Sequence, residues 1–521
     1  MNNHSKETIR TLIIPLSILL IISAFFSFYN LKNAPPGLYP DEAMDGTNAL
    51  QVIAGAGPQV FFPQNSGREG LFMDLQAVAL LVFGQREPWV LRSVSGVFGI
   101  LIVLGMFLFI RAFLDGDVSA QKSSQATFIA YGGAFFAATS FWLINFSRIG
   151  FRAIMAPAFL VWTVYFLVRA LKNYRQKHSS QPQSSTRGAV FLLMAGVVYG
   201  LGMYSYIAYR VTPLLIIFLF LLLRRLYALP WRQIMRSFII FSSAAFLTAL
   251  PLLIYFIHHP ADFFGRTSEL SIFATPAPWQ ELFSNILKTA GMLIVSGDMN
   301  WRQNISGSPA LFWPVALFFC IGFGGMIAAL VSHSVRVQYR HYRQIFFLAI
   351  FMVVWTLISF LPVIFSNEGI PHALRSILMI PAVFGIAGIG VYGAYDFLRD
   401  TISFKILSVF GILSGVGLII YAFFSYFIVW AQNPAVADAF NARSVAIARQ
   451  IDQIPTSLPT YVVVNIPGTL VDGIPVSAQT VMFMTDTYNT ALQQQKNIHY
   501  VTEADEKNIP ADAAVFYLEE Q

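Results

Sequence analysis

Residues 35–46 read PPGLYPDEAMDG, a proline-rich turn followed by three carboxylates within five residues. These carboxylates are Asp41, Glu42 and Asp45, and they come soon after one of the most apolar segments of the chain, residues 9–29. Acids placed directly after a long apolar segment need a reason, because an apolar chain that lies in a membrane excludes charge. The position of these carboxylates therefore bears on both the fold and the chemistry of the protein.

The residues after this turn have the pattern of a helix. Pro40 followed by two acids is typical of a helix start, because acidic side chains in the first turn interact favourably with the helix dipole. In a helix over residues 41–54, Asp41, Asp45 and Asn48 share one face. Two interpretations stay open here: a solvated polar face, or a carboxylate that acts as a general base at a membrane surface. We expect Asp45 to be a surface residue.

The composition is that of a polytopic membrane protein. Of 521 residues, 56% are hydrophobic and only 11% are charged, and the mean hydropathy is +0.62. Soluble domains carry about 25% charged residues. The net charge of +7 arises from short basic clusters between apolar runs, as in the cytoplasmic loops of membrane proteins, so no nucleic-acid partner is expected. The single cysteine, Cys320, lies in an apolar run and is expected to pack.

A membrane-spanning helix needs about 20 mostly apolar residues. Residues 69–84 form a shorter apolar segment that carries Asp74 and Gln76, and we predict that it lies at the membrane interface. Residues 9–29 are expected to be an uncleaved anchor. The sequence predicts eleven spans, at 9–29, 89–110, 126–145, 153–171, 188–207, 210–229, 237–257, 309–332, 345–365, 373–395 and 404–430.

The distribution of basic residues predicts the orientation. With a cytoplasmic N-terminus and an interfacial 69–84, the basic runs fall in cytoplasmic loops, as the positive-inside rule requires. If 69–84 crossed the membrane, the runs at 172–177, 224–236 and 335–343 would lie outside. The outer side then carries the first loop, 30–88, a second long loop, 258–308, and the C-terminal residues.

The sequence predicts two domains. Residues 1–430 form an all-α polytopic membrane domain. Residues 431–521 combine β-rich runs at 460–466 and 513–518 with helical patterns near 436–453 and 477–495, which predicts a small extracytoplasmic α/β domain. Its location outside the membrane suggests that it selects an acceptor.

Several arginines fall at the predicted outer ends of spans or in outer loops, where the positive-inside rule does not place them. A planar guanidinium suits a phosphate, so these arginines are candidate phosphate ligands. The alternatives are snorkelling anchors and ion pairs with the acids of the first loop. The candidates are Arg68, Arg148, Arg152 and Arg375.

Other polar residues of the outer side are candidates for substrate binding. Loop residues 298–302 combine an acid, an indole and a guanidinium, which can bind and stack a sugar but also occur in any structured loop. The tyrosine near 206 also fits an interfacial aromatic belt. These candidates are Glu69, Tyr206, Arg210, Asp298, Trp301, Arg302 and His372.

No cofactor is predicted, and the need for a divalent metal is left open. His258, His259 and Asp262 lack a further spaced ligand, so no metal site is assigned. The sequence also contains no P-loop, no dinucleotide-binding glycine motif after a strand, no HExxH and no GxSxG.

The order of these features resembles the GT-C membrane glycosyltransferases, in the group that contains the protein O-mannosyltransferases and the lipid A aminoarabinose transferases. The resemblance covers residues 9 to about 430, and PDEA is its most specific part. It rests on PDEA (40–43), VFGQREPWVLRSVSG (82–96), SRIGFR (147–152) and, for a bacterial branch of that group, GLGMYSYIAYRVTPLL (200–215), NWRQNISGSP (300–309) and ALRSILMIPAVFGIAGIG (373–390).

This resemblance implies an enzyme of a bacterial-type cell membrane that moves a hexose or pentose from a polyprenyl-phosphate donor to an extracytoplasmic protein, lipid or polysaccharide. It implies that Asp41 is the catalytic base, with Glu42 beside it, in an inverting displacement. GREG (67–70) stands where relatives often have a His-Pro-Pro or Glu-Lys-Pro-Pro stretch, which separates Arg68 from the pattern. A polytopic flippase or transporter of the lipid-linked sugar is the alternative function. A third possibility is a non-catalytic scaffold with the C-terminal domain as its binding module.

Overall fold

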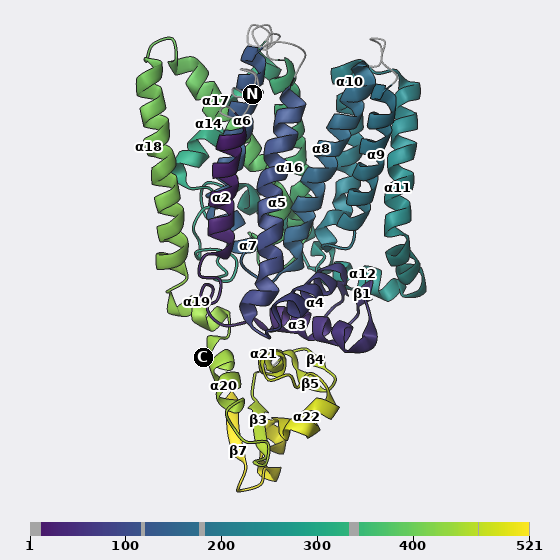
Figure 1. The fold of residues 1–521 in the computed structure, drawn as a ribbon, viewed down its shortest axis with the longest axis vertical. Coiled ribbons are helices and arrows are strands. Elements are labelled where there is room, and N and C mark those ends of the chain that lie inside the picture. Colours follow the sequence, from purple (N-terminus) through teal and green to yellow (C-terminus); the bar gives the residue numbers. More distant parts are fainter. Residues whose placement is uncertain (1–11, 116–119, 177–182, 333–342, 467, 520–521) are drawn as a thin grey trace.

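The computed structural model of the chain describes residues 12–115, 120–176, 183–332, 343–466 and 468–519. These residues form a bundle of long helices, with a small domain attached to one end of it (Figure 1). The first acidic helix and its neighbours lie between the bundle and this domain.

Apolar composition explains the long helices. Within the described ranges, eight helical segments are long and apolar enough to cross a membrane, and each matches a predicted span. They contain α5 (Pro88–Leu114), α8 (Met155–Gln176), α10 (Thr212–Tyr227), α11 (Trp231–His258), α14 (Trp313–Val331), α16 (Arg343–Ile364), α17 (Ile380–Leu398) and α18 (Phe404–Phe423).

The other three predicted spans are also helical, but they differ in length. They correspond to α2 (Ile14–Phe28), α6 (Ala120–Ala138) and α9 (Gln183–Gly202). The predicted bounds 126–145 are wrong, because the helix breaks before Ser140. The Ser140 hydroxyl accepts a hydrogen bond from the backbone of Leu143 and starts a separate short helix, α7 (Phe141–Phe146).

Small residues let the central helices approach closely. A side-chain carbon on Gly390 of α17 would lie 1.8 Å from the backbone oxygen of Phe318 in α14, so no larger residue fits there without moving a helix. Close backbone approach at glycine is a common way to pack membrane helices. By contrast, α18 stands at the edge of the bundle (Figure 1). Most of its apolar side chains are exposed.

The first loop folds as a compact layer across one end of the bundle. It contains α3 (Pro40–Gln51), the π-helix η2 (Val52–Ala56), the hairpin β1 (Phe61–Phe62) and β2 (Arg68–Glu69), and α4 (Leu71–Phe83). With 13 residues, α4 is about 20 Å long, too short to cross a bilayer, as predicted. Exposed apolar residues cover one of its sides, at Val78, Leu81, Val82 and Phe83.

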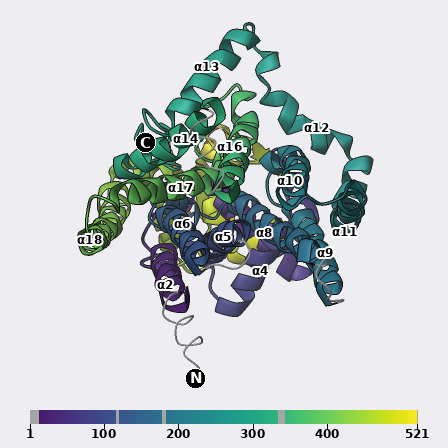
Figure 2. The same ribbon diagram turned by 90° about the horizontal axis from the view of Figure 1, so that it is seen from above.

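The second long loop is largely helical. It forms α12 (Pro260–Glu269), the short 3-10 helix η5 (Ile272–Ala274) and α13 (Pro278–Gly291). In Figure 2, α12 and α13 extend outward from the bundle as an arch that joins α11 to α14. The arch is tied back where Ile272 donates to the carbonyl of Phe365.

The C-terminal domain is built on a parallel three-stranded sheet in the order β6-β3-β7. Register places Thr460 opposite both Ile498 and Ala514. The two predicted strands correspond to β3 and β7, whereas β6 was not predicted. The domain contains α19 (Pro434–Ala439), α20 (Ala442–Ile451), β3 (Thr460–Val464), β4 (Leu470–Val471), β5 (Ile474–Pro475), α21 (Gln479–Met484), α22 (Thr490–Lys496), β6 (Ile498–Thr502) and β7 (Ala514–Leu518).

Each predicted helix of this domain is in fact a pair. The segment 436–453 breaks at Asn441, whose φ of +50° is not helical. The segment 477–495 breaks after Met484, and α22 begins only where the Asn489 side chain accepts from the backbone of Leu492. Asparagine explains the first break, because it tolerates left-handed backbone. At the second break, Asp486 has a φ of +55°, and Asn489 caps the start of α22.

Candidate active site

A cavity of about 230 Å³ opens at the end of the bundle that carries α3. Its charged and polar residues come from the first loop, the segment just before α8, the turn before α10, the second long loop and the segment before α17. Five predicted site residues line it: Asp41, Arg68, Arg152, Tyr206 and Arg375. The other lining residues are Asp45, Asn65, Ser66, Phe151, Ala153, Glu269, Leu270, Glu368 and Leu374.

Asp41 reaches the cavity because α3 begins at Pro40. Tyr39 is the N-cap residue, and its backbone amide donates to Oε2 of Glu42 at 3.2 Å, which closes a capping box. Asp41 sits in the first turn and directs its carboxylate to the cavity. Its Oδ1 accepts a hydrogen bond of 2.8 Å from Nδ2 of Asn65. The Asn65 side chain thus fixes one oxygen of the predicted base.

Glu42 points away from the cavity. It is fully buried, and its oxygens accept from Nε of Arg92 at 3.1 Å and from Nη2 of Arg92 at 2.9 Å. The backbone amide of Gly150 also donates to it. Arg92 donates further to the carbonyls of Pro35 and Gly37, at 2.7 and 2.9 Å. This buried ion pair joins the turn before α3 to the start of α5, so its geometry indicates a structural role.

Asp45 is buried, and the expectation that it is a surface residue is wrong. It forms an ion pair with Arg68, whose Nη2 also donates to Oδ1 of Asn48 at 2.7 Å. Burial raises the pKa of Asp45 to about 6, although the charge of Arg68 acts in the opposite direction. Within the described structure, Nε of Arg68 is buried and has no hydrogen-bond partner. The shared face of Asp41, Asp45 and Asn48 is the face that meets the cavity and Arg68.

Glu69 orients Arg152 from behind the cavity wall. Its Oε2 accepts from Nε of Arg152 at 3.1 Å, and its Oε1 lies 3.9 Å from Nη2 of Arg210. The Arg152 guanidinium lies 5.9 Å from the ring centroid of Tyr206. Arg210 in turn donates to the carbonyl of Phe263 in α12 at 2.8 Å. Glu69 therefore links the two arginines to the second long loop.

Arg375 projects from the segment that precedes α17. Its guanidinium donates to the carbonyl and to Oε2 of Glu368, at 2.8 and 3.2 Å, and to the Ser366 hydroxyl. The backbone of Asn367 donates to Leu270 at 3.0 Å. The walls formed by 269–271 and 366–375 are thus held together.

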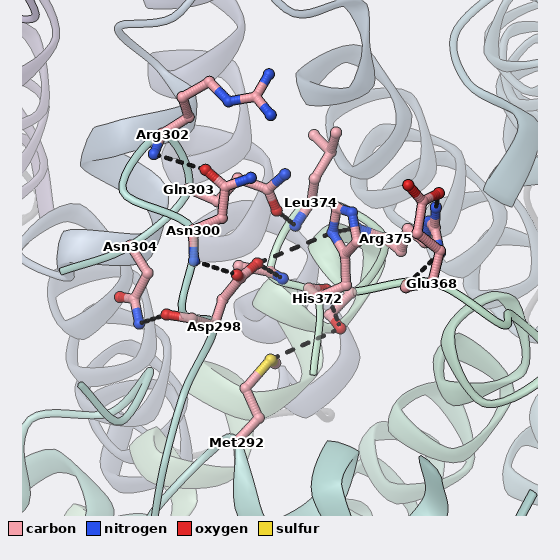
Figure 3. A network of polar contacts seen from close by, with 12 residues as sticks. Met292, Asp298, Asn300, Arg302, Gln303, Asn304, Glu368, His372, Leu374 and Arg375 are labelled. Atoms are coloured by element: carbon pink, nitrogen blue, oxygen red, sulfur yellow. Dashed lines mark hydrogen bonds and ion pairs between the residues drawn. The ribbon is translucent and has the colours of Figure 1, made fainter. Parts of the chain in front are cut away.

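The loop around Asp298 positions this segment (Figure 3). The Asp298 carboxylate accepts from the backbone amides of Asn300 and Ala373, each at 2.8 Å, and lies 3.9 Å from Nδ1 of His372. Oε1 of Gln303 accepts from the backbone of Leu374 at 3.1 Å. Burial raises the pKa of Asp298, and these amide bonds oppose the rise. Asp298 and His372 therefore hold the backbone of the segment that forms this part of the cavity wall.

Three other predicted residues lie outside the cavity. Arg148 is fully buried and donates to the carbonyls of Phe26, Tyr29 and Ala34, so it secures the end of α2. Arg302 stacks on the Tyr39 ring, 3.9 Å from its centroid. The Trp301 carbonyl accepts from Nε1 of Trp430 at 2.8 Å.

Sequence reasoning missed Asn65 and Glu269 in the cavity, and Arg92 beneath it, whereas it placed Glu368 with His372 and Arg375 at the outer end of a span. Asn65 stands in a turn and has a φ of +52°, so its type suggested only a turn. Arg92 carried a usable signal, since a charge just inside an apolar span needs a partner. Nothing in the sequence singles out Glu269. Among the described residues, no group of three His, Cys, Asp or Glu side chains is arranged to hold a metal ion.

No protein-family model matches the sequence, and no curated protein is similar to it. Solved structures do match. The oligosaccharyltransferase of Archaeoglobus fulgidus in its apo form superimposes with a TM-score of 0.51 and 14% identity, over 96% of this chain and 66% of that one. AglB from Archaeoglobus fulgidus, in complex with an inhibitory peptide and a dolichol-phosphate, gives 0.51 and 13%, over 95% and 69%. The chain has the GT-C fold.

This GT-C chain spans about two thirds of the length of those oligosaccharyltransferases. The protein O-mannosyltransferase Pmt1-Pmt2 complex of S. cerevisiae, bound to the sugar donor, is also similar, with a TM-score of 0.36 and 17% identity over 48% of this chain and 34% of that one. The predicted fold class, a helical membrane domain of the GT-C type with a small C-terminal α/β domain, is confirmed.

Proposed function

We propose that this GT-C protein is a membrane glycosyltransferase that moves a sugar from a polyprenyl-phosphate donor to an acceptor outside the cytoplasm. The observation that carries the proposal is the cavity, which holds the Asp41 carboxylate together with the guanidinium groups of Arg68, Arg152 and Arg375. The similarity of the chain to AglB, which was solved with a dolichol-phosphate, supports a lipid phosphate as the donor.

The reaction needs two things from this cavity: a base for the acceptor hydroxyl and positive charge near the departing phosphate. Asp41 takes the proton from the acceptor hydroxyl as that oxygen forms its bond to the anomeric carbon. The bond from the anomeric carbon to the phosphate oxygen breaks, and the departing polyprenyl phosphate keeps the electron pair. Attack from the face opposite the phosphate inverts the anomeric configuration. No enzyme nucleophile is required.

The departing phosphate gains a negative charge in this step, so positive charge must be held near it. Arg152 and Arg375 are only partly buried, and each keeps N–H groups beyond the ion pairs that orient it. Electrostatic stabilisation of a developing charge by fixed groups is a large contribution to enzyme catalysis. Arg68 lies deeper and is held by Asp45 and Asn48, so it contributes positive charge to the cavity wall.

The site's surroundings fit a lipid-borne donor. The helix α4 lies next to α3 (Figure 1) and exposes an apolar side. We therefore expect a hydrocarbon chain to remain in the bilayer beside α4 while its phosphate enters the cavity. We place this end of the bundle outside the cytoplasm, with the N-terminus inside, in a bacterial-type cell membrane. The acceptor is a protein, a lipid or a polysaccharide, and the transferred sugar is a hexose or a pentose. We propose no cofactor, and chelation with EDTA during the assay tests whether a divalent metal takes part.

The test uses the purified chain in lipid nanodiscs with polyprenyl-phosphate mannose and polyprenyl-phosphate arabinose, each labelled in the sugar. Acceptors are supplied as hydroxyl-containing peptides, lipids and oligosaccharides. We expect label to leave the lipid for one acceptor class, and Asp41→Asn to stop the transfer. Extraction of lipid that copurifies with the protein identifies the natural donor.

The alternative function, a flippase or transporter, predicts a different result. It requires lipid-linked sugar to cross a vesicle membrane without cleavage of the sugar–phosphate bond. Protein reconstituted in vesicles and given the same labelled donors distinguishes the two functions. Movement of intact donor, with no released sugar under any acceptor, would overturn the proposal.

A further inference from the structure

The C-terminal domain packs directly against α3, the helix that begins with Asp41. The contact centres on Gly46 and on the ring of Phe483 in α21. A side-chain carbon added to Gly46 would lie 2.7 Å from both Cε2 of Phe483 and Cδ1 of Leu91. Gly46 therefore allows α3 to lie between α5 of the membrane domain and α21 of the C-terminal domain.

The turn before α3 is held by the same domain. The Thr480 hydroxyl is fully buried and donates to the carbonyl of Leu38 at 2.9 Å. Next to it, Gly37 has a φ of +74°, and a side-chain carbon there would lie 2.3 Å from the carbonyl oxygen of Phe440 and 2.7 Å from Ala442. The domain thus contacts the chain on both sides of Asp41.

Two ion pairs complete the junction at its rim. Arg86 lies 3.3 Å from Asp486, and Arg449 lies 3.1 Å from Glu87. Both arginines are well exposed, at 45% and 59%, so these pairs contribute little affinity and mainly favour one register of the junction.

The cavity face of α3 explains why this helix needs support from the C-terminal domain. Its cavity face is polar, with Asp41, Asp45 and Asn48, so that face offers little apolar area to hold the helix in place. The residues after α3, η2, have no buried member. Apolar contact with α21 supplies the packing that the polar cavity face of α3 lacks.

We infer that the C-terminal domain is a positioning element for the catalytic helix, and that Thr480 and Phe483 are its positioning residues. This inference rests on the proposed function for its catalytic consequence. It assigns the domain a role in the rate of the chemical step, in contrast to the selection of an acceptor that its location suggested.

Two matched substitutions test it. Thr480→Val removes the hydrogen bond to Leu38 and keeps the volume of the side chain. Thr485→Val is the control, because the Thr485 hydroxyl is as deeply buried but bonds within the domain, to the carbonyl of Val481 at 2.8 Å. Both variants are made in the full chain, and Thr480→Ser is the conservative variant that restores the bond.

Hydrogen exchange gives a readout that does not depend on catalysis. We expect Thr480→Val, but not Thr485→Val, to speed amide exchange in peptides that cover residues 38–51. Equal exchange in this peptide for wild type and Thr480→Val would overturn the inference, whether or not the protein transfers sugar. Absence of transfer by the wild type would instead overturn the proposed function.

Kinetics with the labelled donor of the transfer assay give the second readout. A lost hydrogen bond that matters only for positioning should lower kcat about three- to tenfold, with the KM for donor and acceptor unchanged. Thr480→Ser should restore kcat, and Thr485→Val should keep it. A raised KM for the acceptor at unchanged kcat, or equal losses in Thr480→Val and Thr485→Val, would contradict positioning.

Phe483 provides an independent check through its contact with Gly46. Gly46→Ala should lower kcat, because the added methyl group displaces α3. Shortening the opposing ring with Phe483→Leu should recover part of that loss in the double variant. Purely additive effects of the two substitutions would show that the residues are not coupled and would overturn the role of this contact.

Discussion

Nδ2 of Asn65 donates a hydrogen bond of 2.8 Å to Oδ1 of Asp41, and this bond joins the turn of the first loop to the first turn of α3. One oxygen of the carboxylate is thereby oriented, and the residue lines the cavity. A general base needs this combination, because it must be held in place and still reach the proton that it removes.

Replacement of Asp41 tests the base directly. Asp41→Asn keeps the size of the side chain but removes the proton acceptor, so we expect kcat to fall about 10²- to 10⁴-fold. Thermal unfolding in detergent should be unchanged, since Asp41 forms no buried ion pair in the described structure. Asp512→Asn, an exposed site in the C-terminal domain, is the control. Wild-type turnover in Asp41→Asn would rule out this base.

The arginines of the cavity are expected to act through geometry as well as charge. Arg375→Lys keeps the positive charge but loses the planar fork that engages two oxygens at once. We expect kcat/KM for the lipid donor to fall about tenfold, which corresponds to roughly 1.4 kcal/mol. Arg399→Lys, beyond the far end of α17, is the control, because Arg399 pairs with Asp396 at the surface. Equal transfer rates in the two variants would argue against a phosphate contact.

The buried ion pair of Glu42 and Arg92 should stabilise the folded protein. Glu42→Gln removes the charge that compensates buried Arg92, and breaking one partner of a buried ion pair costs about 3–5 kcal/mol. A lower unfolding temperature and a lower yield of folded protein are expected. Glu87→Gln is the control, because its pair with Arg449 is exposed and such pairs contribute little. An unchanged unfolding temperature in Glu42→Gln would contradict a structural role.

The pKa of Asp45 predicts the direction of a pH effect. Its pKa is about 6 in the folded protein, above the ordinary value of 3.8, so the folded state binds the proton more tightly than the unfolded state does. The stabilisation from this group is therefore complete below pH 3.8 and is lost as the pH rises through 6. We expect the unfolding temperature of wild type, relative to Asp45→Asn, to be higher at pH 4.5 than at pH 7.5. A difference that grows with pH would contradict the assigned pKa.

The membrane domain could be predicted well because apolar segments and basic clusters are local properties of the sequence. Residues 69–84 are an example: length and the charge distribution of later loops both indicated a helix that does not cross the membrane, and α4 is such a helix. The boundary at Ser140 was missed, because one capping hydroxyl outweighed an otherwise continuous apolar run.

The candidate site was predicted in part for a related reason. Asp41 and the arginines were singled out by residue type and by their position relative to spans. Asp45 was misjudged, because its burial depends on Arg68, 23 residues away, and such pairing has no local pattern. The positions of Glu269 and Glu368 likewise depend on the backbone bonds between the second loop and the segment before α17. Long-range contacts of this kind appear only in three dimensions.

The junction between α3 and α21 also bears on biosynthesis. A ribosome delivers Asp41 to the membrane early, whereas Arg375 emerges much later and Thr480 later still. A nascent chain therefore carries the proposed base long before it has Arg375, the proposed phosphate ligand, or the contacts of α21 with α3. The proposed site is therefore complete only after the last domain has been synthesised and has folded back onto the first loop.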